Sequence, residues 1–301
     1  MTGRERVARA MRHEPVDRVP VMAQLALGHY FLHSTHSAAD IWFDSGVFAE
    51  TLRAFSTRYG FDGFLVNLPG RPPDWRRHVL DHRTEEASGV LNWDGAFEIV
   101  FPRDDNAQLR RPGGSPIPRA DYLTVDPQNP ATYRVPGYVW NTWHAPCLFD
   151  IPEDADLRDA DTYPDWFTAA LRAARTCDTL SVHAEVFSPF THLMELIGYE
   201  QSMMALLERP DICHALLDHF SATVIAMAQR YASCAPDALL ISSAFTGAGF
   251  ISRDMYQEFV LPYEGRVVEA GHRAGLIVYT HTCGAIGDRL DLMAATGIDG
   301  I

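Results

Sequence analysis

The spacing of hydrophobic residues changes its period repeatedly along the chain, and the changes mark alternating helices and strands. Spacing typical of amphipathic helices occurs at 4–13, 38–59, 166–177, 199–207, 211–234, 253–270 and 286–295. Short apolar runs typical of buried strands occur at 19–23, 61–67, 180–186, 239–243, 275–281 and 297–301. Strands separated by helices imply right-handed crossovers and a parallel sheet. The pattern predicts an α/β fold, either doubly wound or closed into a barrel.

Nucleotide-binding motifs distinguish these two architectures. No Gly-x-Gly-x-x-Gly follows the first strand, and no Gly-x-x-x-x-Gly-Lys-Ser/Thr occurs anywhere. The barrel is therefore favoured, and we expect a TIM-like (β/α)8 barrel. Such a barrel needs eight strands. About six are recognisable and the last begins where the chain stops, so we expect a barrel truncated on its C-terminal side.

One long segment interrupts the alternation. From about 71 to 161 proline and glycine are frequent, and 90–101 has the pattern of a hairpin around Asp94-Gly95. We interpret the whole of 1–301 as one barrel domain with this irregular insertion. Trp140, Trp143 and His144 either line a substrate pocket or pack the insertion onto its domain.

Composition narrows the class of protein. The net charge is −14 and all 25 basic residues are arginine, which disfavours nucleic acid as a partner because phosphate binding needs a basic patch. No run approaches ~18 apolar residues, and the N-terminus lacks the apolar core of a signal peptide. Five scattered cysteines, an odd number, favour reduced thiols. We expect a cytoplasmic protein that does not enter a membrane.

The most informative chemistry lies at His281 and Cys283, where the run 275–281 ends. Residues two apart on a strand project to the same side, so an imidazole and a sulfur converge there. Both groups bind zinc, and a catalytic zinc typically takes three protein ligands and leaves one position open. The pair is half of such a site. The alternative is simple packing together with a surface histidine.

A second polar face lies on the run 180–186. His183 and Glu185 share one side of this strand, and Glu185 is close to its C-terminal end. In barrels that end carries the chemistry. The residues that could converge there are Asn67, Glu185, Ser242, His281 and Cys283. Glu185 is then a candidate third metal ligand, and Asn67, His183 and Ser242 are candidates for binding substrate. The alternative is that His183 and Glu185 are hydrogen-bonded structural residues.

Several short motifs occur in an order typical of a known family. They are Arg4-Glu-Arg-Val with 15–21, Phe187-Ser-Pro-Phe-Thr191 with 194–200, Phe259-Val-Leu-Pro-Tyr263, and His281-Thr-Cys-Gly284. Because these motifs occur in this order, the chain resembles the uroporphyrinogen decarboxylase superfamily, and within it the cobalamin-dependent methyltransferases. The resemblance implies a TIM-like barrel. The arginines that line the carboxylate pocket of the decarboxylases are missing from 22–30, which favours the methyltransferase branch.

The resemblance also implies a mechanism. Zinc held by His281, Cys283 and one further ligand would lower the pKa of a thiol substrate, whose thiolate attacks the methyl group of methylcobalamin on a separate corrinoid protein. Glu185 and His281 are the expected catalytic residues. The family's third ligand is a later cysteine, which would lie beyond Ile301, so a fragment, a substitution by Glu185, and a site without metal all stay open. A metal-independent decarboxylase or lyase and a catalytically silent binding protein are the rival functions.

Overall fold

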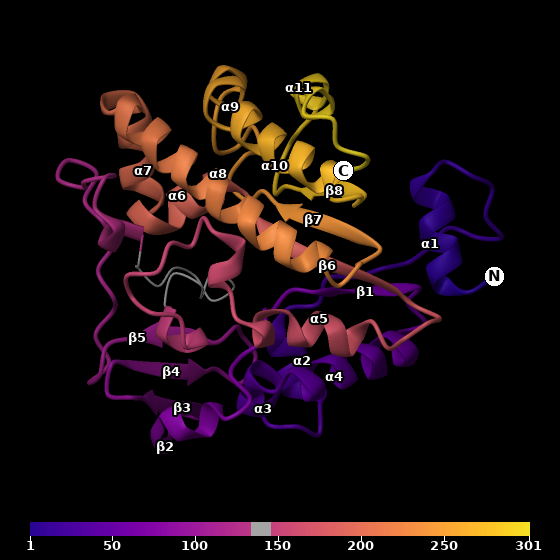
Figure 1. Ribbon diagram of the computed structural model, residues 1–301, viewed down its shortest axis with the longest axis horizontal. Coiled ribbons are helices and arrows are strands. Elements are labelled where there is room, and N and C mark those ends of the chain that lie inside the picture. The colour runs from indigo at the N-terminus through magenta and orange to yellow at the C-terminus, as the bar shows by residue number, and fades with distance from the viewer. Residues whose placement is uncertain (134–145) are drawn as a thin grey trace. The chain divides into compact units, whose positions relative to one another are not determined.

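The computed structural model describes residues 1–133 and 146–301. The chain forms two compact units, and strand β6 passes from one to the other. The described residues of the first unit are 1–118, 146–150 and 164–182, and those of the second are 119–133, 151–163 and 183–301. Figure 1 shows the order of the elements along the chain. The prediction of a single domain over 1–301 stays a prediction.

The first unit contains five helices and one parallel strand among its described residues. The helices are α1 (Gly3–Met11), α2 (Leu27–His33), α3 (Ala38–Phe43), α4 (Ser45–Tyr59) and α5 (Ala169–Ala174), and the strand is β1 (Gly63–Val66). The side chain of Asp44 accepts hydrogen bonds from Gly46 N–H and Val47 N–H, which fixes the start of α4. Gly60 ends α4 in the left-handed region at φ 69°, a conformation that glycine adopts without a steric penalty.

An antiparallel sheet occupies part of the predicted insertion. It consists of β2 (Val79–Glu85), β3 (Ser88–Trp93), β4 (Phe97–Phe101) and β5 (Gln108–Arg110), in that order. The hairpin predicted at 90–101 is the β3–β4 pair, in which Trp93 lies opposite Phe97. Strands β2 and β5 were not predicted because most of their residues are charged or polar and all of their side chains are at least partly exposed.

Short 3-10 helices make up much of the remaining described chain. They are η1 (Trp75–His78), η2 (Pro130–Tyr133), η4 (Pro146–Phe149), η5 (Ala160–Thr162) and η6 (Asp165–Thr168). Such helices are used as short connectors because their hydrogen bonds are poorer than those of α-helices.

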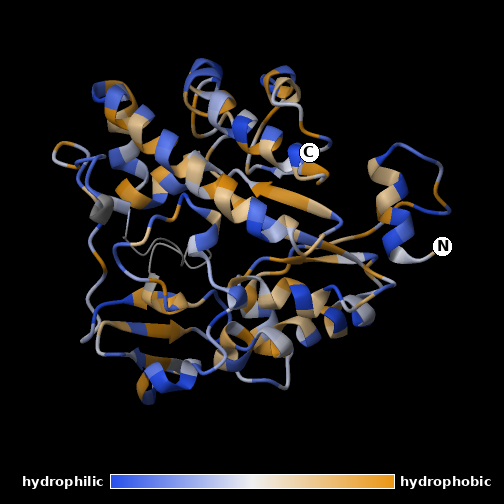
Figure 2. Cartoon of the chain, in the orientation of Figure 1, coloured by the Kyte–Doolittle hydropathy of each residue, from blue (hydrophilic) through white to orange (hydrophobic). Residues whose placement is uncertain are grey.

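The second unit is built on three parallel strands in the order β6-β7-β8. They are β6 (Ser181–Phe187), β7 (Ala238–Ser242) and β8 (Val278–His281). Every residue of β6 and β7 is buried, and β7 stands out as hydrophobic in Figure 2. Strands that are buried along their whole length are typical of parallel sheets that are covered on both faces.

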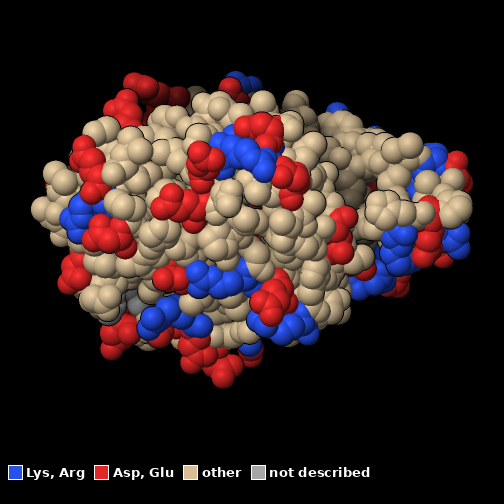
Figure 3. All heavy atoms as spheres, turned by 90° about the horizontal axis from the view of Figure 1, so that it is seen from above, with Lys and Arg blue, Asp and Glu red and all other residues tan. Residues whose placement is uncertain are grey.

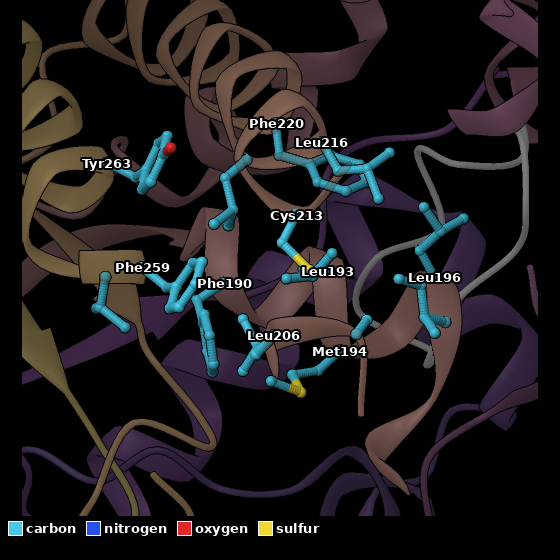
Figure 4. Close-up of a cluster of buried hydrophobic side chains, with 14 of the residues drawn as sticks. Phe190, Leu193, Met194, Leu196, Leu206, Cys213, Leu216, Phe220, Phe259 and Tyr263 are labelled. Carbon is cyan, nitrogen blue, oxygen red and sulfur yellow. The ribbon is translucent and has the colours of Figure 1, made fainter. Parts of the chain in front are cut away.

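Six helices follow these strands. They are α6 (Pro189–Ile197), α7 (Tyr199–Glu208), α8 (Pro210–Ala232), α9 (Arg253–Phe259), α10 (Leu261–Arg273) and α11 (Leu290–Ala295). Their apolar faces form one core cluster (Figure 4), in which Phe190 and Leu193 of α6 meet Leu216 and Phe220 of α8. Burial of these side chains is the main force that holds the helices together.

The helix boundaries differ from the predicted ones where local chemistry breaks a helix. The region 253–270 is two helices, because Pro262 in the first turn of α10 has no N–H with which to continue α9. The run 19–23 contributes only an isolated bridge between Met22 and Gly63. Helices α2 and α6 were not predicted at all.

The surface of the described residues mixes both charges. In Figure 3 acidic and basic side chains are interspersed on the visible face, and uncharged residues cover most of it. None of the described helices is long and apolar enough to cross a bilayer.

Candidate functional site

His281 and Cys283 lie close together at the end of β8. The Nε2 atom of His281 is 3.7 Å from the Sγ atom of Cys283, and both residues are exposed. In tetrahedral zinc sites with ordinary Zn–N and Zn–S bond lengths, the nitrogen and sulfur are separated by roughly 3.6 Å. The two side chains therefore fit a shared metal ion without rearrangement, and their exposure leaves further coordination positions accessible.

Two polar pairs line one face of the parallel sheet. Strand register places Ser242 level with His281, and Leu240 level with both Glu185 and Tyr279. Side chains two apart on each strand share that face. The predicted alternation on β6 agrees with this arrangement, since His183 and Glu185 both make polar contacts on it.

The first pair is His183 with Tyr279. The Nδ1 atom of His183 is 2.8 Å from the hydroxyl oxygen of Tyr279. Burial lowers the pKa of His183 to about 4, and a weaker effect of Asp237 opposes it. Burial also raises the pKa of Tyr279, assisted by the negative charge of Glu185. At neutral pH the pair is therefore uncharged, so it can orient a group by hydrogen bonding but does not supply a cation.

The second pair is Glu185 with Ser242. The hydroxyl of Ser242 donates a hydrogen bond to Oε1 of Glu185, and both side chains are buried. This contact fixes the carboxylate on the face that ends at His281. Among the described residues, however, no group of three or more His, Cys, Asp or Glu side chains is assembled as a metal site. The role of Glu185 as a third ligand stays a prediction.

The remaining predicted residues belong to other parts of the chain. Asn67 follows β1 in the first unit, and its buried Oδ1 has no hydrogen-bond partner among the described residues. The other predicted site residues all belong to the second unit. Trp140, Trp143 and His144 lie outside the described residues.

Two residues of this region were missed in the sequence. Tyr279 stands two positions before His281, so the same period of two that grouped His281 with Cys283 also places Tyr279 on that face. Glu264 lies on α10, three and four residues before the buried Val267 and Val268. Helical spacing therefore puts this carboxyl on the buried side of the helix, which is a signal that sequence reading can detect.

Comparison with protein families gives the context of these residues. The family model described as uroporphyrinogen decarboxylase (URO-D) matches residues 149–301, slightly more than half of the chain. The chain belongs to the uroporphyrinogen decarboxylase family. The matched region contains β6, β7 and β8, together with His281 and Cys283.

Two curated proteins that are similar in sequence to this chain are both named methylcobamide:CoM methyltransferase MtbA. The chain is 26% identical to the protein from Methanosarcina acetivorans and 27% identical to that from Methanosarcina mazei. Each match extends over 122 residues, which is 40% of this chain. The match spans 36% of the length of each relative.

A solved structure shows the fold. The chain superimposes on a methyltransferase from Methanosarcina mazei with a TM-score of 0.62 at 16% identity, covering 100% of this chain and 75% of that one. This similarity and the uroporphyrinogen decarboxylase family confirm the predicted TIM-like barrel class. Among the described residues the parallel strands do not close into a ring.

Proposed function

We propose that this chain is a zinc-dependent methyltransferase that moves a methyl group between a corrinoid and a thiol or another small acceptor. The observation that carries the proposal is the 3.7 Å separation of His281 Nε2 and Cys283 Sγ on an exposed strand end. The names of the two curated relatives support the same reaction class. The corrinoid is proposed to arrive on a separate carrier protein.

His281 and Cys283 are the residues that would hold the metal, and we propose Glu185 as the third ligand of this chain. Zinc, when bound, supplies a Lewis acid that lowers the pKa of a thiol at its open position. The Ser242 hydroxyl would orient Glu185 by the hydrogen bond to Oε1. Because His281 and Cys283 are exposed, a proton released by the substrate can pass directly to solvent.

We propose that Ser242 and His183 contact the substrate, and the role of Asn67 in the first unit stays a prediction. Ser242 is level with His281 in the strand register, whereas His183 is level with Ala238, four residues earlier on β7. His183 is neutral at neutral pH because burial depresses its pKa to about 4. It would therefore bind a substrate by hydrogen bonding and not by charge.

Metal content tests the proposal. Purified protein should contain about one zinc ion per chain, measured by inductively coupled plasma mass spectrometry. The variants His281→Ala and Cys283→Ser should each lose most of this zinc. The matched control is Cys234→Ser, a partly buried cysteine near the end of α8, which should keep its zinc. Demethylation of methylcobalamin by 2-mercaptoethanol, followed by absorbance, should need the same two residues.

The rival functions predict different results. Activity that survives complete removal of zinc would replace this proposal with a metal-independent decarboxylase or lyase. Variants His281→Ala and Cys283→Ala that change nothing except stability would instead indicate a binding protein without catalysis.

A further inference from the structure

The loop that carries Cys283 is held by the loop that follows β7. The N–H of Ser243 donates to the carbonyl oxygen of His281 at 2.7 Å, and the N–H of Ala248 donates to the carbonyl oxygen of Ala285 at 2.7 Å. These two hydrogen bonds lie on either side of Cys283 along the chain. Cys283 is therefore positioned by a neighbouring loop as well as by its own strand.

Thr246 is the centre of this loop-to-loop contact. Its Oγ1 atom lies 2.7 Å from Oγ1 of Thr282, the residue between the two proposed ligands. Its carbonyl oxygen accepts a 2.7 Å hydrogen bond from Nη1 of Arg289 in the second loop. Thr246 is 1% exposed and Arg289 is fully buried. Hydrogen bonds in such a setting restrict motion, because an unsatisfied buried polar group is costly.

A buried carboxyl group anchors the same network. Glu264 of α10 is 4% exposed, and the hydroxyl of Ser243 donates to its Oε1 atom. Burial raises the pKa of Glu264, while hydrogen bonds from Ser243 and Ser188 act in the opposite direction. Burying a carboxyl group is expensive. The proposed function does not use this one, so its contact with Ser243 requires a separate explanation.

Ser243 connects the carboxyl group to the threonines. The Oγ1 atom of Thr246 donates to the carbonyl oxygen of Ser243 at 2.8 Å and lies 3.0 Å from its hydroxyl oxygen. A continuous series of contacts thus extends from helix α10 through Ser243 and Thr246 to Thr282. All of these residues belong to the second unit.

We propose that Glu264, Ser243 and Thr246 are positioning residues that hold Thr282, and with it the sulfur of Cys283, in the geometry needed to bind a metal with His281. The inference rests on the proposed function, because it assumes that the pair binds metal. Residues that orient metal ligands typically change metal affinity by about 10- to 100-fold when they are removed. None of the three needs to touch substrate.

The first test removes the Thr246 hydroxyl without changing the shape of the side chain. Thr246→Val should weaken Co²⁺ binding, measured by the cobalt–thiolate absorption, by about tenfold or more. Thr246→Ser keeps the hydroxyl, and its Co²⁺ affinity should stay within about threefold of that of the parent protein. The matched control is Thr223→Val on α8, whose buried hydroxyl has no hydrogen-bond partner among the described residues. It should bind Co²⁺ as the parent does.

A second measurement needs no metal. In the metal-free protein, amide hydrogen exchange at Ser243 and Ala248 reports on the two hydrogen bonds that these residues donate. Thr246→Val should speed this exchange about tenfold, and Thr223→Val should not. If Thr246→Val does not fold, Thr282→Val removes the same hydroxyl contact from a partly exposed side chain and should give both effects.

Glu264 is tested by a pair of variants. Glu264→Gln keeps an oxygen that accepts from Ser243 and should stay within about threefold of the parent in Co²⁺ affinity. Glu264→Leu removes the acceptor and should reproduce the loss seen in Thr246→Val. The double variant should be little worse than either single one, because both changes break the same series of contacts.

The outcomes separate the two proposals. A parent protein that binds no Co²⁺ overturns the proposed function. A parent that binds Co²⁺ and loses it in Cys283→Ser, with Thr246→Val and Thr282→Val indistinguishable from Thr223→Val in affinity and exchange, overturns the positioning role alone. Equal amide hydrogen exchange in Thr246→Val, Thr282→Val and Thr223→Val would overturn the positioning role, whether or not the parent protein binds metal.

Discussion

Gly247 approaches the carbonyl oxygen of Cys283 so closely that a Cβ atom on residue 247 would overlap that oxygen. Only glycine allows the two loops to meet in this way. Gly247→Ala should therefore displace the backbone at Cys283 and reduce zinc content, measured on the purified protein. Because the atom that the new methyl group would meet is backbone, a side-chain rotation cannot relieve the overlap.

Gly249→Ala is the matched control, since nothing lies within 4 Å of a Cβ atom built at that position. It should retain the zinc content of the parent. Equal zinc content in both variants would show that the close approach at Gly247 does not matter for Cys283.

The hydrogen bond from Ser242 to Glu185 should contribute measurably to stability. Ser242→Ala removes a donor from a buried carboxylate and should lower the free energy of unfolding by about 1–3 kcal/mol in urea titrations. Ser221→Ala on α8 is the comparison, because its buried hydroxyl has no partner among the described residues. Removing the Ser221 hydroxyl should lower the free energy of unfolding by clearly less than removing that of Ser242. Equal losses for the two serines would contradict the importance of the Glu185 contact.

Burial of His183 makes stability depend on pH. The folded-state pKa of about 4 lies below the ordinary value of 6.5, so the unfolded chain binds more protons between these values. Stability contributed by neutral His183 is present above pH 6.5 and is lost as the pH falls towards 4, by roughly 3 kcal/mol in total. His183→Gln should flatten this part of the stability profile.

The exposed His82 provides the control for that measurement. His82→Gln should leave the slope between pH 6.5 and 4 unchanged, because the His82 side chain is exposed and its replacement alters no buried group. A His183 variant that retains the full slope would assign the acid sensitivity to other groups.

A buried ion pair at the start of β1 should matter for folding and not for metal. The carboxylate of Asp62 accepts hydrogen bonds from the guanidinium groups of Arg6 and Arg18 and from Val21 N–H. Asp62→Asn should lower the free energy of unfolding by about 1–3 kcal/mol, because it removes the negative charge that pairs with Arg6 and Arg18. Arg6 keeps its ion pair with Asp17, which limits the loss. Zinc content per folded chain should not change.

The reference for that variant is the exposed carboxylate of Asp81, which lies 3.6 Å from the partly exposed guanidinium group of Arg83. Asp81→Asn should cost less than about 1 kcal/mol, since water screens the two charges. Similar losses for the two aspartates would mean that burial at Asp62 adds little.

Predictions from the sequence succeeded where the two-residue repeat of a β-strand dominates the pattern. The alternation on β6 correctly grouped His183 with Glu185, and the same rule brought His281 and Cys283 together at a strand end. The hairpin at 90–101 was also correct, because Asp94-Gly95 is a strong turn signal between apolar runs.

The failures have physical causes of their own. Helix α6 was missed because it has only nine residues and all of them are buried, and so short a segment is hard to tell from a buried strand by its sequence. The partnership of Ser243 with Glu264 joins residues on different elements through one hydroxyl group. No spacing rule predicts which buried carboxyl a given serine reaches, because that depends on how α10 packs.

The hydrogen bonds of the Thr246 and Thr282 hydroxyl groups have a fixed donor and acceptor. Thr246 has a single hydroxyl proton and gives it to the carbonyl oxygen of Ser243, so the proton between the two threonines must come from Thr282. The partly exposed Thr282 then offers only lone pairs to its surroundings. A neighbouring group can therefore donate a hydrogen bond to the Thr282 hydroxyl but cannot accept one from it.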